Sequence, residues 1–92
     1  MPKHIAAEPL EFLADQCLAE SKRKQYPLDI LSAGGYLHLE VSELIEALRG
    51  KRGNAEHEAA DVLFQLLTII RSRRLNIDRI LKRLEKLAPE LE

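Results

Sequence analysis

The chain has 92 residues, enough for one domain, and its 14 Lys and Arg nearly balance 15 Asp and Glu. The formal net charge of −1 argues against a strongly basic nucleic-acid-binding module, so no nucleic-acid partner is expected. No apolar stretch approaches the roughly 20 residues of a membrane-spanning helix, and the sequence begins with no pattern typical of a secretory signal. We therefore expect a single domain over residues 1–92, located in the cytoplasm and without a membrane partner.

The first half of the chain contains two predicted helices. Helical spacing of apolar residues predicts the first from Pro9 to Lys24, where proline suits the first turn. The second is predicted from Tyr36 to Arg49, because Gly50 is placed to end a helix.

Two further helices are predicted in the second half. Asn54 and Asn76 are good N-cap residues, so one helix should run from just after Asn54 to about Arg73 and another from just after Asn76 to about Ala88. No segment has the alternating pattern of a β-strand. The sequence thus predicts an all-α fold.

The third predicted helix is hydrophobic on nearly all sides between residues 59 and 70. A helix of this kind is expected at the centre of a fold, or against a partner chain, and not on a surface. One narrow polar stripe interrupts it, formed by Glu58, Asp61, Gln65 and Thr68 at steps of three or four residues. The stripe is therefore a candidate site inside an otherwise apolar environment.

The second helix carries a matching acidic pair. Glu40 and Glu43 are three residues apart and project from one side of the helix, whereas Glu46 should point toward solvent. A short connection makes the second and third helices antiparallel neighbours. Glu40 and Glu43 can then face Glu58 and Asp61 across one groove.

Carboxylates held together in such a groove would need protons or a cation to offset their repulsion. Two carboxylates about 5 Å apart repel by roughly 3 kcal/mol at an effective dielectric near 20. Oxygen ligands without His or Cys suit Mg²⁺, with Mn²⁺ as a substitute. The alternative from the residues alone is a solvated acidic face, where the repulsion would cost only a few tenths of a kcal/mol.

The two acidic motifs carry a family resemblance. The segment 36–49, with its Glu-x-x-Glu, and the segment 58–67, with its Glu-x-x-Asp, resemble the all-α nucleotide pyrophosphohydrolases of the MazG type. The resemblance implies a four-helix MazG-like bundle completed by dimerisation or tetramerisation. It also implies that Glu40, Glu43, Glu58 and Asp61 are catalytic and bind Mg²⁺. The implied reaction converts a nucleoside triphosphate, ribo or deoxy, to the monophosphate and pyrophosphate, as in cleansing of the nucleotide pool.

Two other functions compete with this interpretation. The run from Ala59 to Leu67 and the following Leu75 to Asp78 also resemble phosphoribosyl-ATP pyrophosphohydrolase, although its usual Ser-Tyr-Thr segment is missing from the amino-terminal half. The other is a non-catalytic helical dimerisation module whose acidic groove binds a basic partner.

Several residues outside the acidic motifs are candidates for substrate binding. Aromatic rings can stack on a base and amides can read its edge, while lysines can contact phosphates. For each of these residues, packing or solubility is an alternative role. The candidates for base recognition are Phe12, Gln16, Tyr26 and Tyr36. Lys82 and Lys86 are candidates for phosphate contacts, and Gln65 is a further candidate because it extends the acidic stripe beside the metal ligands.

Overall fold

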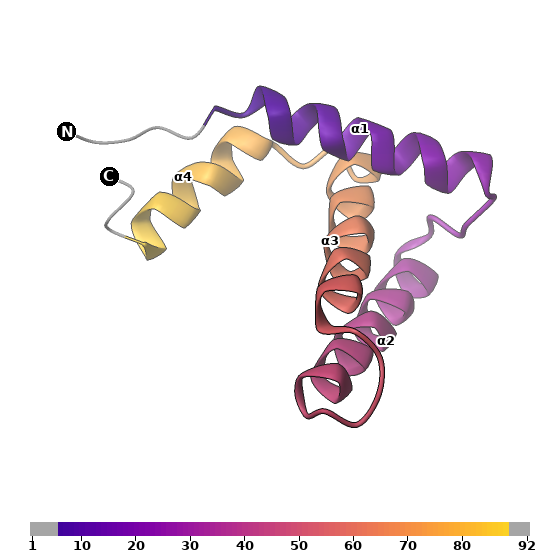
Figure 1. Ribbon diagram of the computed structural model, residues 1–92. Helices are drawn as coiled ribbons and strands as arrows, with labels where there is room; N and C mark the ends of the chain where they lie inside the picture. Colours follow the sequence, from indigo (N-terminus) through magenta and orange to yellow (C-terminus); the bar gives the residue numbers. More distant parts are fainter. Residues whose placement is uncertain (1–5, 89–92) are drawn as a thin grey trace.

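The computed structural model describes residues 6–88 and contains four helices (Figure 1). They are α1 (Glu8–Arg23), α2 (Ile30–Leu48), α3 (Ala55–Ser72) and α4 (Ile77–Leu87). Residues 6–88 contain no strand, so the all-α prediction is confirmed. The predicted bounds of α1, α3 and α4 agree with the structure to within one residue. The outer ends of the expected domain, 1–5 and 89–92, lie outside the described residues.

The predicted start of α2 at Tyr36 is wrong, because the helix begins six residues earlier at Ile30. The side chain of Asp29 caps it by accepting a hydrogen bond of 3.0 Å from the backbone N–H of Ser32. Gly34 and Gly35 lie inside the helix. A glycine in a helix interior costs only about 1 kcal/mol relative to alanine, and a good N-cap contributes a similar amount in favour of the helix.

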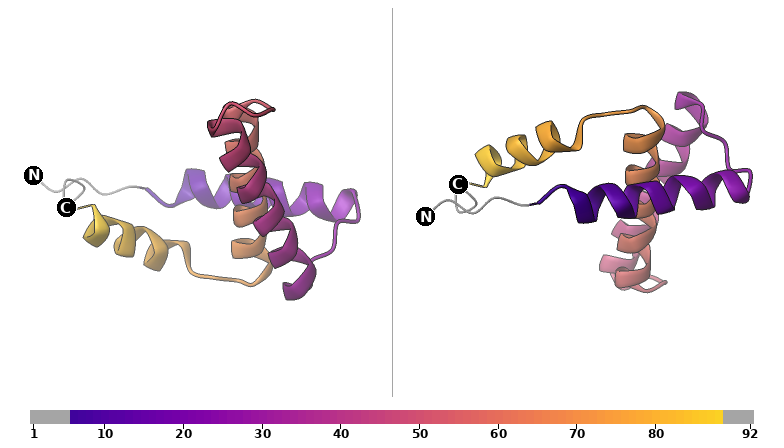
Figure 2. Two further views of the ribbon diagram at one scale, coloured as in Figure 1. Left: turned by 90° about the horizontal axis from the view of Figure 1, so that it is seen from below. Right: turned by 90° about the horizontal axis from the view of Figure 1, so that it is seen from above.

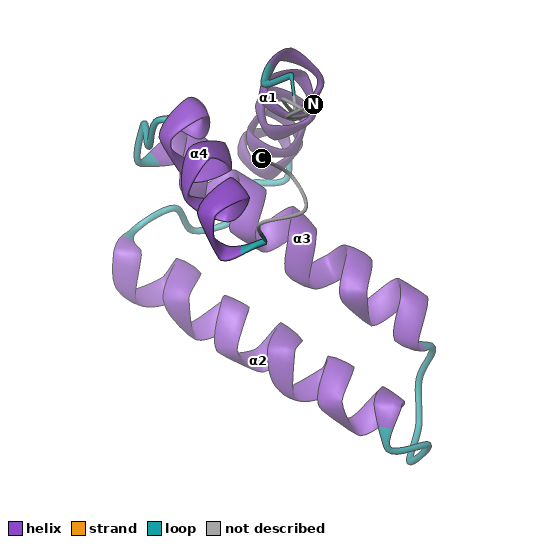
Figure 3. Ribbon diagram, turned by 90° about the vertical axis from the view of Figure 1, so that its left-hand side faces the viewer, coloured by secondary structure: helices purple, strands orange, loops and turns teal. Residues whose placement is uncertain are grey.

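The helices α2 and α3 form an antiparallel hairpin, and α1 crosses the end of it that is remote from the 49–54 connection (Figures 1 and 3). The helix α4 leaves the α1 end of the hairpin and extends away from it (Figure 2). The hairpin fixes the relative positions of the two acidic motifs. None of the described helices is both long and apolar enough to cross a membrane.

The hydrophobic core lies where α1, α3 and the start of α4 meet. Small side chains of α1, Ala14 and Cys17, allow α3 to approach closely, and burial raises the pKa of the Cys17 thiol. The remaining buried members are Ala7, Leu67, Ile70, Ile77 and Leu81.

Polar contacts also join α1 to α3. The buried hydroxyls of Ser21 and Thr68 are 3.3 Å apart and share a hydrogen bond. Near the surface, the Arg71 guanidinium donates to both carboxylate oxygens of Asp15, with 3.3 Å between Nη2 and Oδ2. Arg71 therefore has a structural role between helices.

The expectation that α3 is buried on nearly all sides is only partly correct. It packs against both α1 and α2, yet Leu63 is 56% exposed and Leu66 is 40% exposed. The reason is that a single chain supplies helices to only part of its circumference. One apolar side of α3 is left uncovered.

The Asp29 cap is testable by substitution. Asp29→Ala should lower the free energy of unfolding by about 1 kcal/mol, because the first turn of α2 loses its cap. Urea unfolding followed by circular dichroism measures this change. Asp29→Asn is the control, since its amide oxygen can still accept the Ser32 bond; an equal loss in both variants would show that the cap is not the cause.

Candidate functional site

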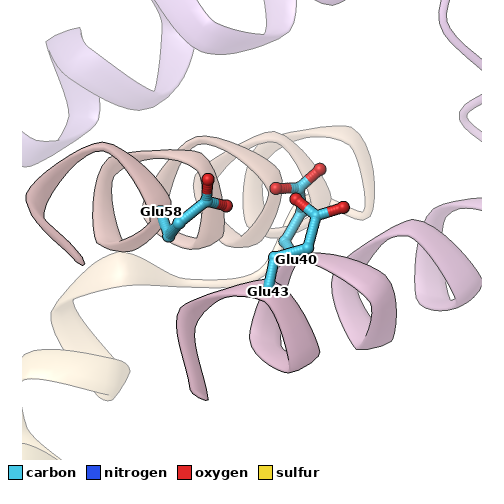
Figure 4. A group of neighbouring side chains, drawn as sticks. All are labelled: Glu40, Glu43 and Glu58. Atoms are coloured by element: carbon cyan, nitrogen blue, oxygen red, sulfur yellow. The ribbon is translucent and has the colours of Figure 1, made fainter. Parts of the chain in front are cut away.

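The hairpin brings three of the predicted acids into one group. Glu40 and Glu43 extend from α2 and Glu58 extends from α3, and their side chains point toward one another (Figure 4). One carboxylate oxygen from each residue lies within 4.8 Å of those of the other two. The prediction that these two helices place their acids in a common groove is therefore confirmed for these three side chains.

The group is partly withdrawn from solvent without being neutralised by the protein. Glu40 Oε2 and Glu58 Oε2 are buried, and neither has a hydrogen-bond partner among the described residues. Burial raises the pKa of Glu40, and the negative charges of Glu43, Asp61 and Glu58 raise it further. Burial is also the main cause that raises the pKa of Glu58, followed by its contact with Glu43.

Asp61 lies beside this group but is more exposed. It is not among the three residues whose oxygens meet within 4.8 Å, although its charge contributes to the raised pKa values of Glu40 and Glu58. Glu46 instead forms an ion pair of 3.4 Å with Arg52 at the surface, in agreement with its expected solvent-facing position.

The turn before α3 lets the chain approach Glu58. Gly53 has φ of +86°, a conformation that favours glycine. A Cβ atom at this position would lie 3.6 Å from Glu58 Oε1 and 3.8 Å from the Ala47 Cβ. These distances are ordinary van der Waals contacts, so the positive φ of the turn, and not a lack of space, is what favours glycine here.

The donor chemistry of the group suits a hard divalent cation. Its carboxylate oxygens come from two helices, and two of them are buried without a partner, which is costly unless a cation or proton is bound. Oxygen-only ligands favour Mg²⁺ or Mn²⁺ over zinc. These residues therefore fit a metal of that class.

A cavity of about 470 Å³ adjoins the acids. Glu40 and Asp61 form part of its wall, and three aromatic residues, Tyr26, Tyr36 and Phe64, form another part. Its remaining lining residues are Gln65, Glu20, Lys24 and Pro27. This volume falls within the range of roughly 300–1,000 Å³ typical of small-molecule sites.

The cavity separates the predicted substrate-binding residues into two groups. Tyr26, Tyr36 and Gln65 line it. The other four candidates are exposed and are not among its lining residues: Phe12, which is 65% exposed, Gln16, Lys82 and Lys86.

Sequence analysis missed Glu20, Lys24, Pro27 and Phe64 as wall residues. Glu20 lies on α1, whereas Lys24 and Pro27 enter through the α1–α2 connection, where Gln25 adopts a φ of +58°. No local pattern marks such a reversal at a glutamine. Phe64 directly precedes Gln65 of the polar stripe, but its apolar surroundings indicated only packing.

Comparison with known families supplies independent information. The sequence model of phosphoribosyl-ATP pyrophosphohydrolase matches residues 13–87, which include both acidic motifs. The chain belongs to the phosphoribosyl-ATP pyrophosphohydrolase family. This family is part of the all-α, MazG-like nucleoside triphosphate pyrophosphatase superfamily, so the predicted resemblance is confirmed. No curated protein and no solved structure gives a significant match.

Membership of the phosphoribosyl-ATP pyrophosphohydrolase family identifies the chain as a hydrolase of phosphoric anhydrides. The acidic group and the adjoining cavity are the candidate site for this reaction. Membership also favours an enzyme over the non-catalytic dimerisation module.

The repulsion within the acidic group leads to a stability prediction. Glu40→Gln should stabilise the protein in EDTA at pH 7.5, by on the order of 1 kcal/mol after solvent screening, or roughly 4–8 °C in Tm. The folded-state pKa of Glu40 is raised above the ordinary value of 4.5. Below pH 4.5 Glu40 is largely protonated in both the folded and the unfolded state, so the wild type is free of this repulsion. It acquires the repulsion as the pH rises through the folded-state pKa. The two Tm values should therefore converge in acid.

Thermal unfolding with and without millimolar Mg²⁺ provides the check. Magnesium should raise the Tm of the wild type more than that of Glu40→Gln. A variant less stable than the wild type in EDTA at pH 7.5 would contradict the electrostatic explanation.

Proposed function

We propose that the chain is a Mg²⁺-dependent nucleoside triphosphate pyrophosphohydrolase that cleaves between the α and β phosphates. The products would be a nucleoside monophosphate, ribo or deoxy, and pyrophosphate. The observation that carries the proposal is the pair of buried, unpartnered carboxylate oxygens of Glu40 and Glu58 beside a cavity of nucleotide-binding size. Removal of non-standard nucleotides from the pool would be a biological use of this reaction.

Each acidic residue has a role in this proposal. Glu40, Glu43 and Glu58 would hold the metal, with Asp61 as a fourth ligand from the cavity side. When bound, magnesium would neutralise phosphate oxygens and activate a water molecule. A carboxylate that is not fully engaged as a ligand can accept the proton of the attacking water.

The charges of the cavity wall support a simple nucleoside triphosphate as the substrate. Phosphoribosyl-ATP carries a second phosphate, remote from the triphosphate, and its site would need a cation there. Among the described wall residues only Lys24 is a cation, and its Nζ lies 3.4 Å from the Glu20 carboxylate. The hydrogen bonds from Arg23, reinforced by Lys24, lower the pKa of Glu20 to about 2, so Glu20 is ionised at neutral pH and its single negative charge is shared between Arg23 and Lys24. The described wall residues therefore offer a second phosphate one cation, which is already paired.

Phosphoribosyl-ATP is the second candidate substrate, because the matching family is described by that activity. The two candidates share the anhydride bond and the acidic groove. They differ only in what occupies the far part of the cavity, so a direct comparison of substrates decides between them.

The proposed reaction is tested with purified protein, Mg²⁺ and a panel of common and damaged nucleoside triphosphates beside phosphoribosyl-ATP. Glu58→Gln and Asp61→Asn should each lower pyrophosphate release at least 100-fold while circular dichroism still shows a helical fold. Removal of metal with EDTA should have the same effect on the wild type. Glu46→Gln is the matched control on α2 and should retain full activity, because Glu46 pairs with Arg52 outside the groove.

The outcomes of the assay separate the proposals. Near-normal activity of Glu58→Gln or Asp61→Asn would rule out the assigned metal ligands. Hydrolysis of phosphoribosyl-ATP in preference to every nucleoside triphosphate would leave the metal site intact and establish the second candidate substrate.

We also propose that the hairpin associates with other copies of the chain to form a homodimer or homotetramer. Val41, Ile45 and Leu48 of α2 are 38%, 48% and 69% exposed. They lie roughly 80–140° around the helix from Glu40, at 100° per residue, and so avoid the acidic groove. Like Leu63 and Leu66 on α3, they are exposed apolar side chains that a chain of this size is expected to bury by self-association.

Sedimentation velocity tests the association. The wild type should sediment as a dimer or tetramer, and Ile45→Lys should shift it toward the monomer, since a charge buried at an apolar interface is strongly unfavourable. Glu56→Lys, at an exposed charged position at the start of α3, is the control and should leave the assembly unchanged. A monomeric wild type would contradict the proposal.

A further inference from the structure

We propose that Gln65 reads the base of the bound nucleotide and thereby sets the nucleotide preference of the enzyme. The inference rests on the proposed function, because it assigns a role within the same substrate cavity. It follows from the position of Gln65 relative to the acids, from the fixed orientation of its amide, and from the aromatic residues around it.

The hairpin places Gln65 one helical turn beyond the acids. Gln65 follows Asp61 by four residues on α3, and Tyr36 precedes Glu40 by four residues on α2. Because α2 and α3 are antiparallel, both steps run in the same direction, toward α1, and each covers about 6 Å at 1.5 Å per residue. Phosphates bound at the acids would therefore direct the nucleoside toward the level of Gln65 and Tyr36.

The amide of Gln65 is held in one orientation. Its Nε2 donates a hydrogen bond of 3.3 Å to the backbone carbonyl of Ala33, a group that can only accept. The nitrogen must therefore face Ala33, which leaves the Oε1 oxygen as an acceptor for a ligand in the cavity. A base offers a ring N–H or an exocyclic amine as the matching donor.

The surrounding wall suits the flat faces of a base. Tyr26, Tyr36 and Phe64 line the same cavity as Gln65, and aromatic side chains bind bases by stacking. Stacking tolerates any base, since every base has a π-face. Among the described residues of the wall, Gln65 supplies the side-chain amide, so an oriented polar contact of this kind would provide the discrimination that stacking lacks.

The test compares substrates with and without a base. Gln65→Met keeps the length of the side chain but removes both polar atoms. It should lower kcat/KM for the preferred nucleoside triphosphate about tenfold, mainly through KM, because a lost hydrogen bond leaves a polar edge of the base unpaired. Hydrolysis of ribose 5-triphosphate, which has no base, should change less than about twofold.

Two controls make the comparison specific. Gln16→Met makes the same chemical change at an exposed amide of α1 that does not line the cavity, and it should behave as the wild type toward both substrates. Gln65→Asn keeps the amide but withdraws it by one methylene. It should change the ranking of the bases and provides the readout if Gln65→Met does not fold.

Each outcome has one meaning. An equal loss on both substrates would assign Gln65 a purely structural role, and an unchanged base ranking in both Gln65 variants would also overturn the inference. A wild type that cleaves ribose 5-triphosphate as well as any nucleotide would overturn it while leaving the anhydride chemistry in place. A wild type inactive on every triphosphate would instead refute the proposed function, before any Gln65 variant is considered.

Discussion

The mutual repulsion of carboxylates held in a partly buried groove is the constraint on which the rest of the molecule depends. Packing of α2 against α3 brings Glu40, Glu43 and Glu58 together, and two of their carboxylate oxygens are buried without a hydrogen-bond partner among the described residues. The fold can sustain this cost because its stabilising core lies elsewhere, where α1 crosses α3 and the start of α4 joins them. The hydrophobic core thus lies near α1, at one end of the hairpin, and the acidic group lies closer to the 49–54 connection (Figures 1 and 4). The acidic residues are therefore not needed for the packing of the core.

The polar stripe of α3 connects these two ends. Thr68 is buried and bonded to Ser21, so it belongs to the contact between α1 and α3. One turn toward the loop, Gln65 bonds to the Ala33 carbonyl and also lines the cavity, so it links packing with ligand space. Asp61 and Glu58 follow at the open end, where solvent and the 49–54 connection meet. The spacing of three and four residues therefore places a structural hydroxyl, a cavity-lining amide and two acids in order along one face of α3.

The sequence was sufficient for what local chemistry determines. The side chains of Asn54 and Asn76 cap α3 and α4 by accepting hydrogen bonds of 3.0 Å from backbone N–H groups, as such residues commonly do. The acids of α2 and α3 lie together because the short connection favours antiparallel packing of the two helices. It was insufficient where two local preferences compete or where distant segments meet. At α2 the Asp29 cap and the packing against α3 together offset the cost of two glycines. The cavity wall depends on a left-handed residue, Gln25, and on the position of α1, and neither follows from helical periodicity.

The same distinction explains why family membership identifies the reaction more readily than the substrate. In the proposed function, the acids of α2 and α3 would hold the metal beside the phosphoric anhydride, which a simple nucleoside triphosphate and phosphoribosyl-ATP share. The rest of the substrate would lie against other residues of the cavity wall, among them Tyr26, Lys24 and Gln65. There, Lys24 shares the Glu20 carboxylate with Arg23, and its Nζ lies 5.9 Å from the centre of the Tyr26 ring. Three aromatic side chains and a single, already paired cation among the described wall residues support the proposal that this part of the cavity binds an uncharged base and not a second phosphate. The evidence on the substrate thus comes from residues that the acidic motifs do not include.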